Sequence, residues 1–518
     1  MLTPASAACS NTSVGDSLPS DRVEWEWRSI IISPRLPRWA ETNWQNEAMS
    51  NDATKPNAKP DAGANRSRTP TSQQFLDYMG SGWADNATVA TQKSPAADYT
   101  PDRRAKVAAA FAGEVILIEA GPAATRSNDT EYRYRPHSAF AHLTGWGAPT
   151  VPDSVLVIDA REESTQCILF LRETAGKDSS EFFANAAIGE FWVGQRPSLG
   201  EVSQLLGLET RSLSEYDSYV ESLNKNVITL EHPALAEFVS ELRLVKDEYE
   251  IEEMRKAVAA SIKGFEQVVA NFGKAKAHPR GERVIETAFF SEARANGNDL
   301  GYETIAAAGD HACTLHWIIN NGPVRDGDLL LLDAGVELES LYTADVTRTV
   351  PINGKFSPIQ REVYEAVLEA ADAVFAMAKP GVKFRDMHAT AMRVIAEKTH
   401  GWGFLPGSVE DSLNPENQHH RRWMVHGTGH HLGLDVHDCA QARREMSLDA
   451  ELKPGMVFTI EPGLYFHRND LLVPEEFRGI GVRIEDDVVV TETGVENLTA
   501  ALPRKVEELE AWLAKHSG

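Results

Sequence analysis

Cysteine is scarce in this sequence. Four occur in 518 residues, namely Cys9, Cys167, Cys313 and Cys439. Their spacing is unlike that of a thiolate metal site, and a chain of this length does not need disulfide bonds to fold. We therefore expect free thiols in a reducing compartment, which predicts a cytoplasmic protein.

Long apolar runs are absent as well. No stretch of the sequence approaches the roughly 18 apolar residues of a membrane-spanning helix. The beginning of the sequence also lacks the basic start and the apolar segment that are typical of a signal peptide. We therefore expect neither membrane insertion nor export.

Positive charge is in short supply. Lys and Arg number 51 against 76 Asp and Glu, which gives a formal net charge of −25 at pH 7. A surface of this sign repels the phosphates of nucleic acids and anionic membranes. The charge balance therefore predicts no nucleic-acid partner and no membrane partner.

The first hundred residues differ in composition from the rest. Residues 1–100 are rich in Ser, Asn, Ala, Asp, Thr and Pro, and they offer too little apolar surface to offset the entropy of ordering. We expect a mostly disordered extension. Within it, residues 23–39 are aromatic and apolar, which fits either a docking peptide or sequence upstream of a true start at Met49.

The remaining length predicts two domains, since one domain usually takes roughly 100–200 residues. Residues 101–243 contain short β-branched runs between Gly, Pro and Asp, which predict an α/β domain with strands near 115–120, 154–160 and 167–173. Residues 244–518 then form the second domain.

A long amphipathic helix should open the second domain. Asp247 is a suitable N-cap, Glu250 follows three residues later as in a capping box, and apolar residues recur at helical spacing from Ile251 to Phe265. Strands are expected near 329–335, 346–350, 457–461 and 481–490, with a helix near 361–378. The fold class is α/β (α+β).

Acidic residues interrupt segments of this domain that should be buried. They are Asp333, Asp345, Glu461 and Glu485, and His430 lies in a Gly-rich loop. Carboxylates are rarely buried unless something neutralises them. Four carboxylates and one neutral imidazole carry four negative charges, which two divalent cations balance. The pattern predicts a two-metal site.

Each of these positions also has an ordinary explanation. Asp333 could be a turn residue ahead of Gly335, Glu485 could belong to a solvated acidic run with residues 486–487, and a His-rich Gly loop can be a surface turn. It is their joint occurrence that favours the metal site.

The proposed ligands are oxygen-rich, with one imidazole and no thiolate. Such a set favours Mn²⁺ and permits Co²⁺, Fe²⁺ or Zn²⁺. Two such ions can lower the pKa of a shared water and polarise a carbonyl oxygen. Hydrolysis is the chemistry that this site predicts.

Five stretches carry a family resemblance: residues 131–146, 333–357, 426–439, 457–465 and 474–499. They resemble the Xaa-Pro aminopeptidases (aminopeptidase P) of the pita-bread metallopeptidase family, and the likeness covers roughly residues 125–515. The resemblance implies an N-terminal α/β domain followed by a pita-bread catalytic domain. It also implies cleavage of peptides after the first residue when the second is proline.

The resemblance assigns roles to individual residues. It gives the two metals to the same four carboxylates and imidazole. It implies that His316, His426 and His437 contact the substrate and stabilise the charge that develops on it. Glu461 is implied as the proton shuttle, and Arg483, which would alternate with Glu485 along one strand, as a partner for buried acid.

Other implications of the resemblance are less direct. Tyr302 matches a family position near the site, and His431 is expected to be structural. Relatives of this type form homo-oligomers, so a dimer or a tetramer is expected.

Among relatives of the same fold, prolidase is the main alternative, whereas the five ligands and the large N-terminal domain disfavour creatinase and methionine aminopeptidase. Prolidase shares the ligands and the two-domain plan but requires a dipeptide, and it closes its site around the free carboxylate with a cationic group or a narrowed exit. The metal-site motifs contain Arg348, Arg478 and Arg483. Creatinase works without metals, and methionine aminopeptidase lacks the large N-terminal domain. A non-catalytic binding protein is the alternative from another class.

Overall fold

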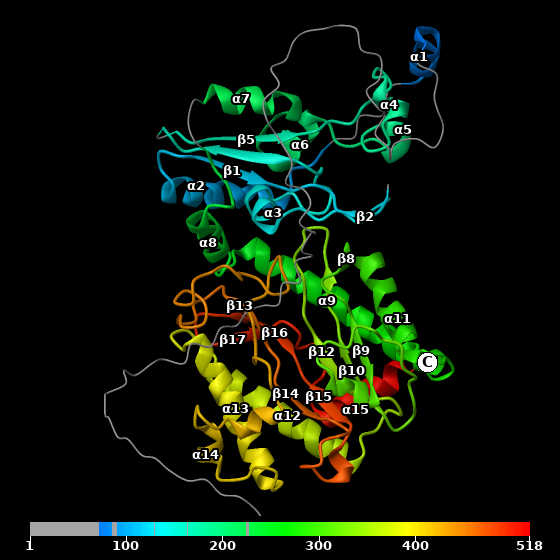
Figure 1. The fold of residues 1–518 in the computed structure, drawn as a ribbon, viewed down its shortest axis with the longest axis vertical. Coiled ribbons are helices and arrows are strands. Elements are labelled where there is room, and N and C mark those ends of the chain that lie inside the picture. Colours follow the sequence, from blue (N-terminus) through cyan, green and yellow to red (C-terminus); the bar gives the residue numbers. More distant parts are fainter. Residues whose placement is uncertain (1–71, 85–90, 129, 163, 224–226, 518) are drawn as a thin grey trace, which may run out of the picture. The chain divides into compact units, whose positions relative to one another are not determined.

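The computed structural model describes residues 72–84, 91–128, 130–162, 164–223 and 227–517 (Figure 1). These residues belong to one compact unit, 61–518. The aromatic segment 23–39, the alternative start Met49 and Cys9 lie outside the described residues.

The N-terminal domain is built on a five-stranded sheet with the order β6-β5-β4-β1-β7. The antiparallel strands at its centre confirm the three predicted ones, and the pairings β5–β6 and β1–β7 are parallel. The strands are β1 (Val115–Glu119), β4 (Val155–Asp159), β5 (Gln166–Leu171), β6 (Glu209–Ser212) and β7 (Val227–Ile228).

Both faces of this sheet are covered. Successive side chains point to opposite faces, so Ile116 and Ile118 enter one core while Val115 and Leu117 enter another. The covering helices are α2 (Thr100–Ala110), α3 (Ser138–Thr144), α6 (Leu199–Leu206), α7 (Tyr216–Ser222) and α8 (Pro233–Leu242). The smaller elements are η1 (Pro95–Asp98), β2 (Thr125–Ser127), β3 (Thr130–Glu131), α4 (Glu181–Ala184), α5 (Glu190–Val193) and η2 (Leu213–Glu215).

Helix α1 (Gln73–Gly80) lies in the stretch that was predicted to be mostly disordered. Ser72 caps its first turn, and the Phe75 ring contacts the Phe183 ring edge-on at 5.5 Å between centroids. Phe75 is partly buried, so this contact with α4 offsets part of the ordering entropy, and residues 73–80 form a helix within the stretch expected to be mostly disordered. Residues up to 71 lie outside the described range.

The second domain begins with the predicted helix, α9 (Glu248–Ala270). The Asp247 side chain accepts from the Glu250 N–H and the Glu250 side chain accepts from the Asp247 N–H, so the predicted capping box is confirmed. The other helices are α10 (Phe272–Lys276), α11 (Gly281–Asn296), η3 (Gly309–Cys313), α12 (Pro358–Met377), α13 (Phe384–Gly401), α14 (Val409–Leu413), η4 (His419–Arg422), η5 (Glu475–Phe477) and α15 (Val506–His516).

Short antiparallel sheets form the centre of this domain. Their pairings are β12-β10-β9, β13-β16-β17, β14-β15 and β11-β8. The strands are β8 (Asp299–Leu300), β9 (Ile305–Ala308), β10 (Leu329–Asp333), β11 (Val336–Glu337), β12 (Thr347–Pro351), β13 (Val457–Ile460), β14 (Gly463–Phe466), β15 (Ile480–Arg483), β16 (Asp486–Val490) and β17 (Val495–Asn497). One large apolar core joins these sheets to α9, α11, α12 and α13.

The single strand predicted over 481–490 is two strands. β15 pairs with β14, whereas β16 pairs with β13, so the chain changes partner at residues 484–485. In the break, the Ile484 N–H donates to Pro462 O and the Glu485 N–H donates to Thr347 O. Arg483 therefore ends one strand and Glu485 lies between two, and the expected alternation of these residues along one strand is wrong.

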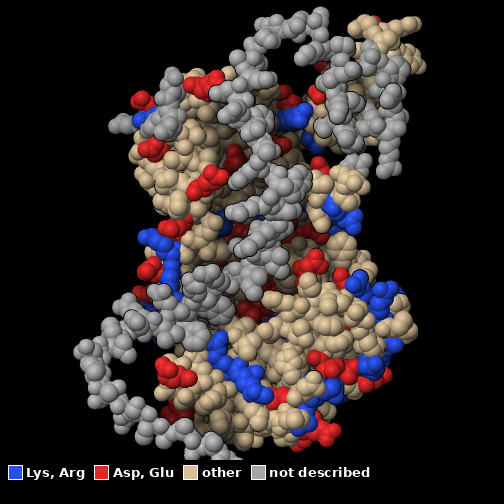
Figure 2. Space-filling view, in the orientation of Figure 1, with Lys and Arg blue, Asp and Glu red and all other residues tan. Residues whose placement is uncertain are grey.

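Charged residues of both signs cover the surface. On the face shown in Figure 2, acidic and basic side chains are interspersed. No helix in the described part of the chain is both long and apolar enough to span a membrane.

Candidate metal centre

The ends of strands bring the predicted ligands together. Asp333 is the last residue of β10, and Asp345 lies two residues before the neighbouring strand β12. Glu461 follows β13, and Glu485 lies between β15 and β16. His430 belongs to the Gly-rich loop, whose backbone pairs with β13 because the Thr459 N–H donates to His430 O.

The donor atoms of these residues form one cluster. Single ligand atoms of Asp345, His430 and Glu485 all lie within 4.8 Å of one another. His430 Nε2 is also 3.6 Å from Glu461 Oε1. Asp333 joins through the Tyr302 hydroxyl, which is 2.6 Å from Asp333 Oδ1 and 2.5 Å from Asp345 Oδ1.

The imidazole of His430 is oriented for ligation. Its Nδ1 lies 3.1 Å from His431 O, which can only accept, so Nδ1 carries the proton. Nε2 then faces Asp345 Oδ2 at 3.3 Å, and in the neutral ring its lone pair would be directed at a bound cation. A hydrogen bond from the far nitrogen is the usual way in which proteins fix a metal-binding histidine.

The cluster holds more negative charge than its protein surroundings neutralise. Burial, followed by Asp345 and Glu461, raises the pKa of Glu485 well above its usual range. Burial and Asp345 also raise the pKa of Glu461 to about 7, although His430 opposes them. For His430, burial favours the neutral form, but Asp345 and Glu461 outweigh it and raise its pKa to about 9. Cations would relieve all three shifts, so the donor set fits divalent metal ions.

Arg483 neutralises one carboxylate of the cluster. Its Nη2 donates to Asp333 Oδ2 at 2.5 Å, its Nη1 donates to the Tyr465 hydroxyl at 3.0 Å, and its Nε donates to Thr347 Oγ1 at 3.1 Å. Thr347 Oγ1 in turn donates to Glu485 Oε2 at 2.7 Å. The sequence reasoning missed Tyr465 and Thr347. Both lie inside the family-like stretches, but as ordinary residues of β14 and β12.

Three further histidines surround the cluster. Both ring nitrogens of His426 are bonded, since Nδ1 donates to Gly427 O and Nε2 accepts from the Tyr465 hydroxyl, each at 2.7 Å. Burial, then Arg483, lowers the pKa of His426 to about 3, and His316 contributes to this shift. His437 lies 4.4 Å from His430 between ring centroids.

His437 and His316 differ from His426 in being exposed. Partial burial, then the proximity of His430, lowers the pKa of His437 to about 4, and His316 again contributes. The structure therefore brings His426 and His437 to the cluster, and His316 is near enough to contribute to the pKa shifts of both. His431 points elsewhere, since its ring stacks on Phe384 in the core at 4.8 Å.

Gly335 allows the two acidic segments to approach each other. A Cβ atom at this position would lie 1.7 Å from Ala344 O and 3.1 Å from Cε1 of Tyr302. Any side chain would separate the segment of Asp333 from that of Asp345. The glycine is therefore required by the close approach of two backbones and the Tyr302 ring.

A buried ion cluster anchors the loop that carries His430 and His437. Asp438 Oδ1 accepts from Arg243 Nε at 2.9 Å, and Asp438 Oδ2 accepts from Lys246 Nζ at 3.1 Å. The Lys246 side chain is 0% exposed. Burial disfavours the charged form of Asp438, but Arg243 and Lys246 hold its pKa well below the usual range. Because these charges are buried, water cannot solvate one of them when its partner is removed. The ion pairs therefore stabilise the loop.

Lys246→Met should destabilise the protein by about 3 kcal/mol, because loss of one partner leaves a buried charge that is only partly compensated. The expected value lies at the low end of the usual 3–5 kcal/mol since Arg243 still contacts Asp438. The shift of the urea unfolding midpoint measures it. Lys256→Met is the matched control, because Lys256 is exposed and pairs with Glu253 on the same helix face. Equal shifts for the two variants would contradict the anchor.

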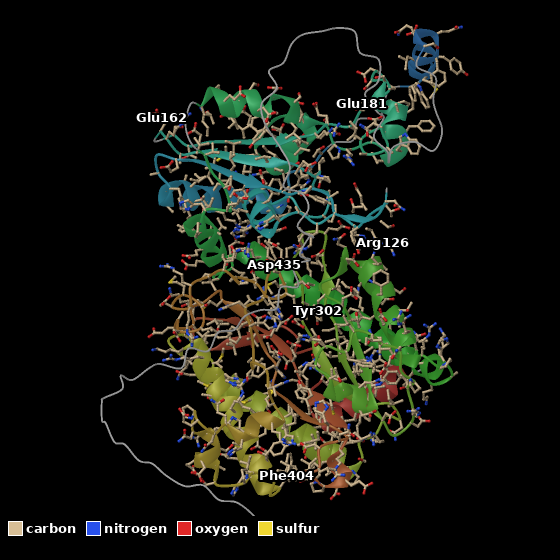
Figure 3. The ribbon with its side chains drawn as sticks, viewed as in Figure 1. Arg126, Glu162, Glu181, Tyr302, Phe404 and Asp435 are labelled. Atoms are coloured by element: carbon tan, nitrogen blue, oxygen red, sulfur yellow. The ribbon has the colours of Figure 1, made fainter. Side chains whose placement is uncertain are left out.

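The N-terminal domain also contacts this loop. Asp435, labelled in Figure 3, accepts from Ser138 Oγ at 2.5 Å and lies 3.3 Å from Arg243 Nη2. Arg135 donates to Glu337 Oε2 at 2.6 Å and to Leu434 O. Polar contacts from α3 and the residues before it therefore reach both the segment between Asp333 and Asp345 and the histidine loop.

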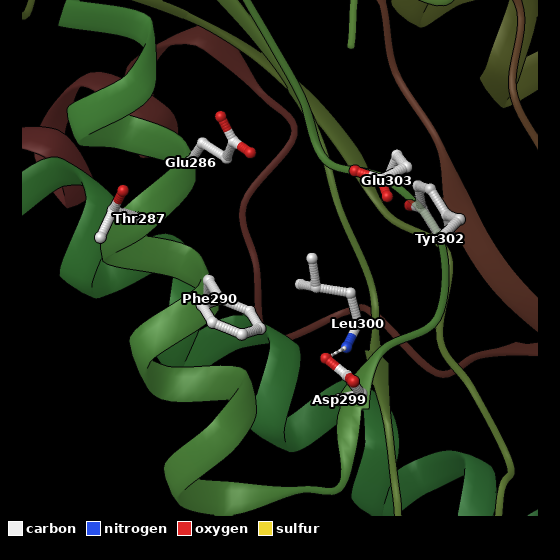
Figure 4. Close-up of a pocket in the computed structure, with 7 residues that line it drawn as sticks. All are labelled: Glu286, Thr287, Phe290, Asp299, Leu300, Tyr302 and Glu303. Carbon is white, nitrogen blue, oxygen red and sulfur yellow. Dashed lines mark hydrogen bonds between the residues drawn. The ribbon is translucent and has the colours of Figure 1, made fainter. Parts of the chain in front are cut away.

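A cavity of about 510 Å³ lies beside Tyr302 (Figure 4). Its wall combines the apolar side chains of Phe290 and Leu300 with three carboxylates. Because the Tyr302 hydroxyl reaches two carboxylates of the cluster, the cavity adjoins the candidate metal centre. The lining residues are Glu286, Thr287, Phe290, Asp299, Leu300, Tyr302 and Glu303.

Comparison with protein families identifies both domains. Residues 252–492 match the model of metallopeptidase family M24, and residues 100–229 match that of the aminopeptidase P N-terminal domain. The matched regions contain the five clustered residues and the sheet of the N-terminal domain, respectively.

Curated relatives and solved structures agree with these matches. Xaa-Pro aminopeptidase 1 of Streptomyces coelicolor is 46% identical over 465 residues, which cover 86% of this chain and 93% of the relative. The Escherichia coli Xaa-Pro aminopeptidase is 36% identical over 440 residues, covering 80% of this chain and 97% of the relative. Zinc-substituted E. coli aminopeptidase P in complex with product superposes with a TM-score of 0.71 at 31% identity, covering 82% of this chain and all of that one.

Proposed function

Because the chain belongs to metallopeptidase family M24 and, within it, to the Xaa-Pro aminopeptidases, we propose that it removes the N-terminal residue from peptides whose second residue is proline. The enzyme is a metallo-exopeptidase with an aminopeptidase P domain from about 101 to 243 and a pita-bread catalytic domain from about 244 to 518. The observation that carries the proposal is the buried cluster of Asp345, His430 and Glu485.

Five side chains would hold two divalent ions: Asp333, Asp345, His430, Glu461 and Glu485. When bound, such ions polarise a carbonyl oxygen and lower the pKa of a shared water. Oxygen-rich ligands with one imidazole favour Mn²⁺, so we propose manganese as the metal, with Co²⁺, Fe²⁺ or Zn²⁺ as possible substitutes.

Neighbouring side chains move and hold protons during the reaction. Glu461 takes a proton from the attacking water and passes it to the prolyl nitrogen, and its Oε2 lies 3.6 Å from His426 Nδ1. The exposed imidazoles of His437 and His316 donate N–H bonds to the oxygen on which negative charge develops. Arg483 and His426 hold the Tyr465 hydroxyl between them and so fix its orientation beside the cluster.

A bond to proline requires a dedicated site. The amide of Xaa-Pro has no N–H, and the ring fixes φ near −65°, so a protease that binds extended strands through their N–H groups cannot hold it well. Recognition must come from a pocket that fits the ring and from groups that bind the free amino group of the first residue. The acidic surroundings of the cluster suit that amino group.

The site favours peptides that continue beyond proline. A dipeptidase needs a free cation for the carboxylate of its substrate. The three arginines of the metal-site motifs already bind protein oxygens: Arg348 donates to Asp486, Arg478 to Val473 O and Arg483 to Asp333. This supports an aminopeptidase over a prolidase.

Peptide length separates the two activities. We expect Xaa-Pro-Yaa to be cleaved with a higher kcat/KM than Xaa-Pro, and Xaa-Ala-Yaa to be at least about tenfold poorer than Xaa-Pro-Yaa because alanine underfills the proline pocket. Steady-state assays on the three matched peptides with Mn²⁺ measure this. A dipeptide that is better by tenfold would make the enzyme a prolidase with the same metals.

We also propose a cytoplasmic homo-oligomer. Cys167, Cys313 and Cys439 are free thiols, as expected in a reducing compartment. An exposed apolar group on the N-terminal domain, including Phe191 and Trp192, supports association with further copies of the chain.

A further inference from the structure

Glu282 is a buried carboxylate that the proposed reaction does not use. It lies in the first turn of α11 and is 0% exposed. Its Oε1 accepts from the Ala308 N–H at 2.9 Å and from His311 Nδ1 at 2.7 Å. Its Oε2 accepts from Trp317 Nε1 at 3.0 Å and from the Gly322 N–H at 2.6 Å. The four donors replace the hydrogen bonds that water would make to an exposed carboxylate. Together they hold the buried Glu282 carboxylate in one position.

The four donors share one location, the segment 308–322. This segment leaves β9, passes through η3 and carries His316 at its exposed middle. Glu282 thus joins the beginning, the middle and the end of the same loop. The Glu282 N–H also donates to Gly322 O at 3.1 Å, which closes the contact with the end of the loop.

Both ends of the loop are fixed independently of Glu282. Asn320 is buried in the left-handed region with φ 46°, and its side chain accepts from the Ala306 N–H at 3.0 Å and donates to Thr304 O at 2.8 Å. At the other end, a Cβ atom on Gly481 of β15 would lie 2.4 Å from Ala312 O, so η3 lies directly on that strand. In the middle of the loop, Leu315 and Trp317 are partly buried against the large apolar core, and Arg283 donates to Ile319 O at 2.9 Å.

Trp317 attaches the exposed middle of the loop 308–322 to Glu282. Its indole donates to Glu282 and stacks on the His311 ring at 3.9 Å between centroids. His316 precedes it, whereas Ile318 and Ile319 are 47% and 52% exposed. Because His316 directly precedes Trp317, its position depends on how Trp317 is held, and Trp317 is held by Glu282, His311 and the apolar core.

We propose that Glu282 is a positioning residue of the peptidase reaction, which holds the loop 308–322 and thereby keeps His316 near His426 and His437. The inference rests on the proposed function, because that function assigns His316 a hydrogen bond to the substrate. It adds a residue of α11 that touches neither metal nor substrate.

A double-mutant cycle distinguishes positioning from general stabilisation. Glu282→Gln keeps the shape of the side chain but presents an NH₂ group to two of the four donors. We expect kcat on Xaa-Pro-Yaa to fall about 10- to 100-fold with KM and bound metal nearly unchanged. In a His316→Ala background the same substitution should cost less than about threefold, because the group that it misplaces is already absent.

Amide exchange gives a readout that does not depend on activity. In Glu282→Gln, amides of residues 308–322 should exchange at least several-fold faster, while those of the strands β10 and β12 stay unchanged. Glu292→Gln is the matched control, because Glu292 lies on the same helix and its side chain bonds only locally, to Asn296. It should leave both kcat and exchange as in the wild type.

Each adverse outcome has a distinct meaning. An equal loss of kcat in both backgrounds, or no loss in either, would overturn the proposal. If Glu282→Gln does not fold, Trp317→Phe removes a single donor and should show a smaller loss that again disappears with His316→Ala. A wild-type enzyme that fails to cleave Xaa-Pro-Yaa would refute the proposed function instead, and unchanged exchange of the loop would still refute the role of Glu282.

Discussion

Glu485→Gln or Asp345→Asn should lower kcat/KM by more than about 10²-fold, and added Mn²⁺ should not restore the activity. Residues that only orient metal ligands are worth about 10- to 100-fold, so removal of a ligand should cost more. Both side chains belong to the group whose ligand atoms lie within 4.8 Å of one another. Activity assays after chelation and reloading, with the bound metal counted, measure the effect.

The same Glu485 variant should have the opposite effect on the metal-free protein. Burial, then Asp345 and Glu461, raises the pKa of Glu485 in the folded chain. A carboxyl group with a raised folded-state pKa destabilises the fold once the pH exceeds its unfolded-state value, so the neutral amide should raise the Tm of stripped protein at pH 7. Mn²⁺ should then raise the Tm of the wild type far more than that of the variant.

Asp372→Asn is the matched control for both measurements. Asp372 lies on α12, is not a member of the cluster, and pairs with Arg504 at 3.0 Å while half exposed. It should bind metal and respond to Mn²⁺ as the wild type does. Full activity in chelated wild-type protein, or recovery of Glu485→Gln on reloading, would be incompatible with the two-metal site.

His437→Ala should lower kcat about 10²-fold and leave bound metal nearly unchanged. The His437 ring lies edge-on to His430 at 4.4 Å between centroids, but the cluster of donor atoms is formed by other side chains. A donor to a developing oxyanion acts in the transition state, so kcat and kcat/KM should fall together.

His400→Ala is the control for this substitution, because His400 is an exposed residue in the last turn of α13. Metal content and kinetic constants measured on the same preparations decide the result. If the metal is lost in proportion to activity, His437 is a ligand or part of the fold, and the oxyanion role is wrong.

The sequence predicts which residues form the cluster better than it predicts how they are arranged. Asp333 and Glu461 are recognisable because each ends an apolar run that must be buried, and the neutralisation of buried charge follows from general physics. That Asp345 and His430 face each other at 3.3 Å does not follow from a separation of 85 positions. It depends on pairing between distant strands, which a single sequence does not encode locally.

The break at 484–485 illustrates the same limit. The sequence predicts one strand over residues 481–490, but the two halves pair with different partners, β14 and β13. The change of partner places Arg483 against Asp333 and Glu485 beside Thr347. Tyr465, Thr347 and Glu282 were likewise not predicted, because a strand tyrosine, a strand threonine and a helical glutamate have ordinary roles in most proteins.

The ion cluster around Asp438 joins the stretch between the two domains to the second domain. Arg243 and Lys246 lie in the stretch that follows the matched N-terminal region, which ends at 229, and precedes the matched catalytic region, which begins at 252. This connecting stretch should therefore be kept together with the histidine loop, both in evolution and in engineered chimeras. A chimera that joins the catalytic region to a foreign N-terminal domain at residue 247 would leave the Asp438 carboxylate without its two cations. Substitution of Asp438 would likewise be tolerated only together with changes at Arg243 and Lys246.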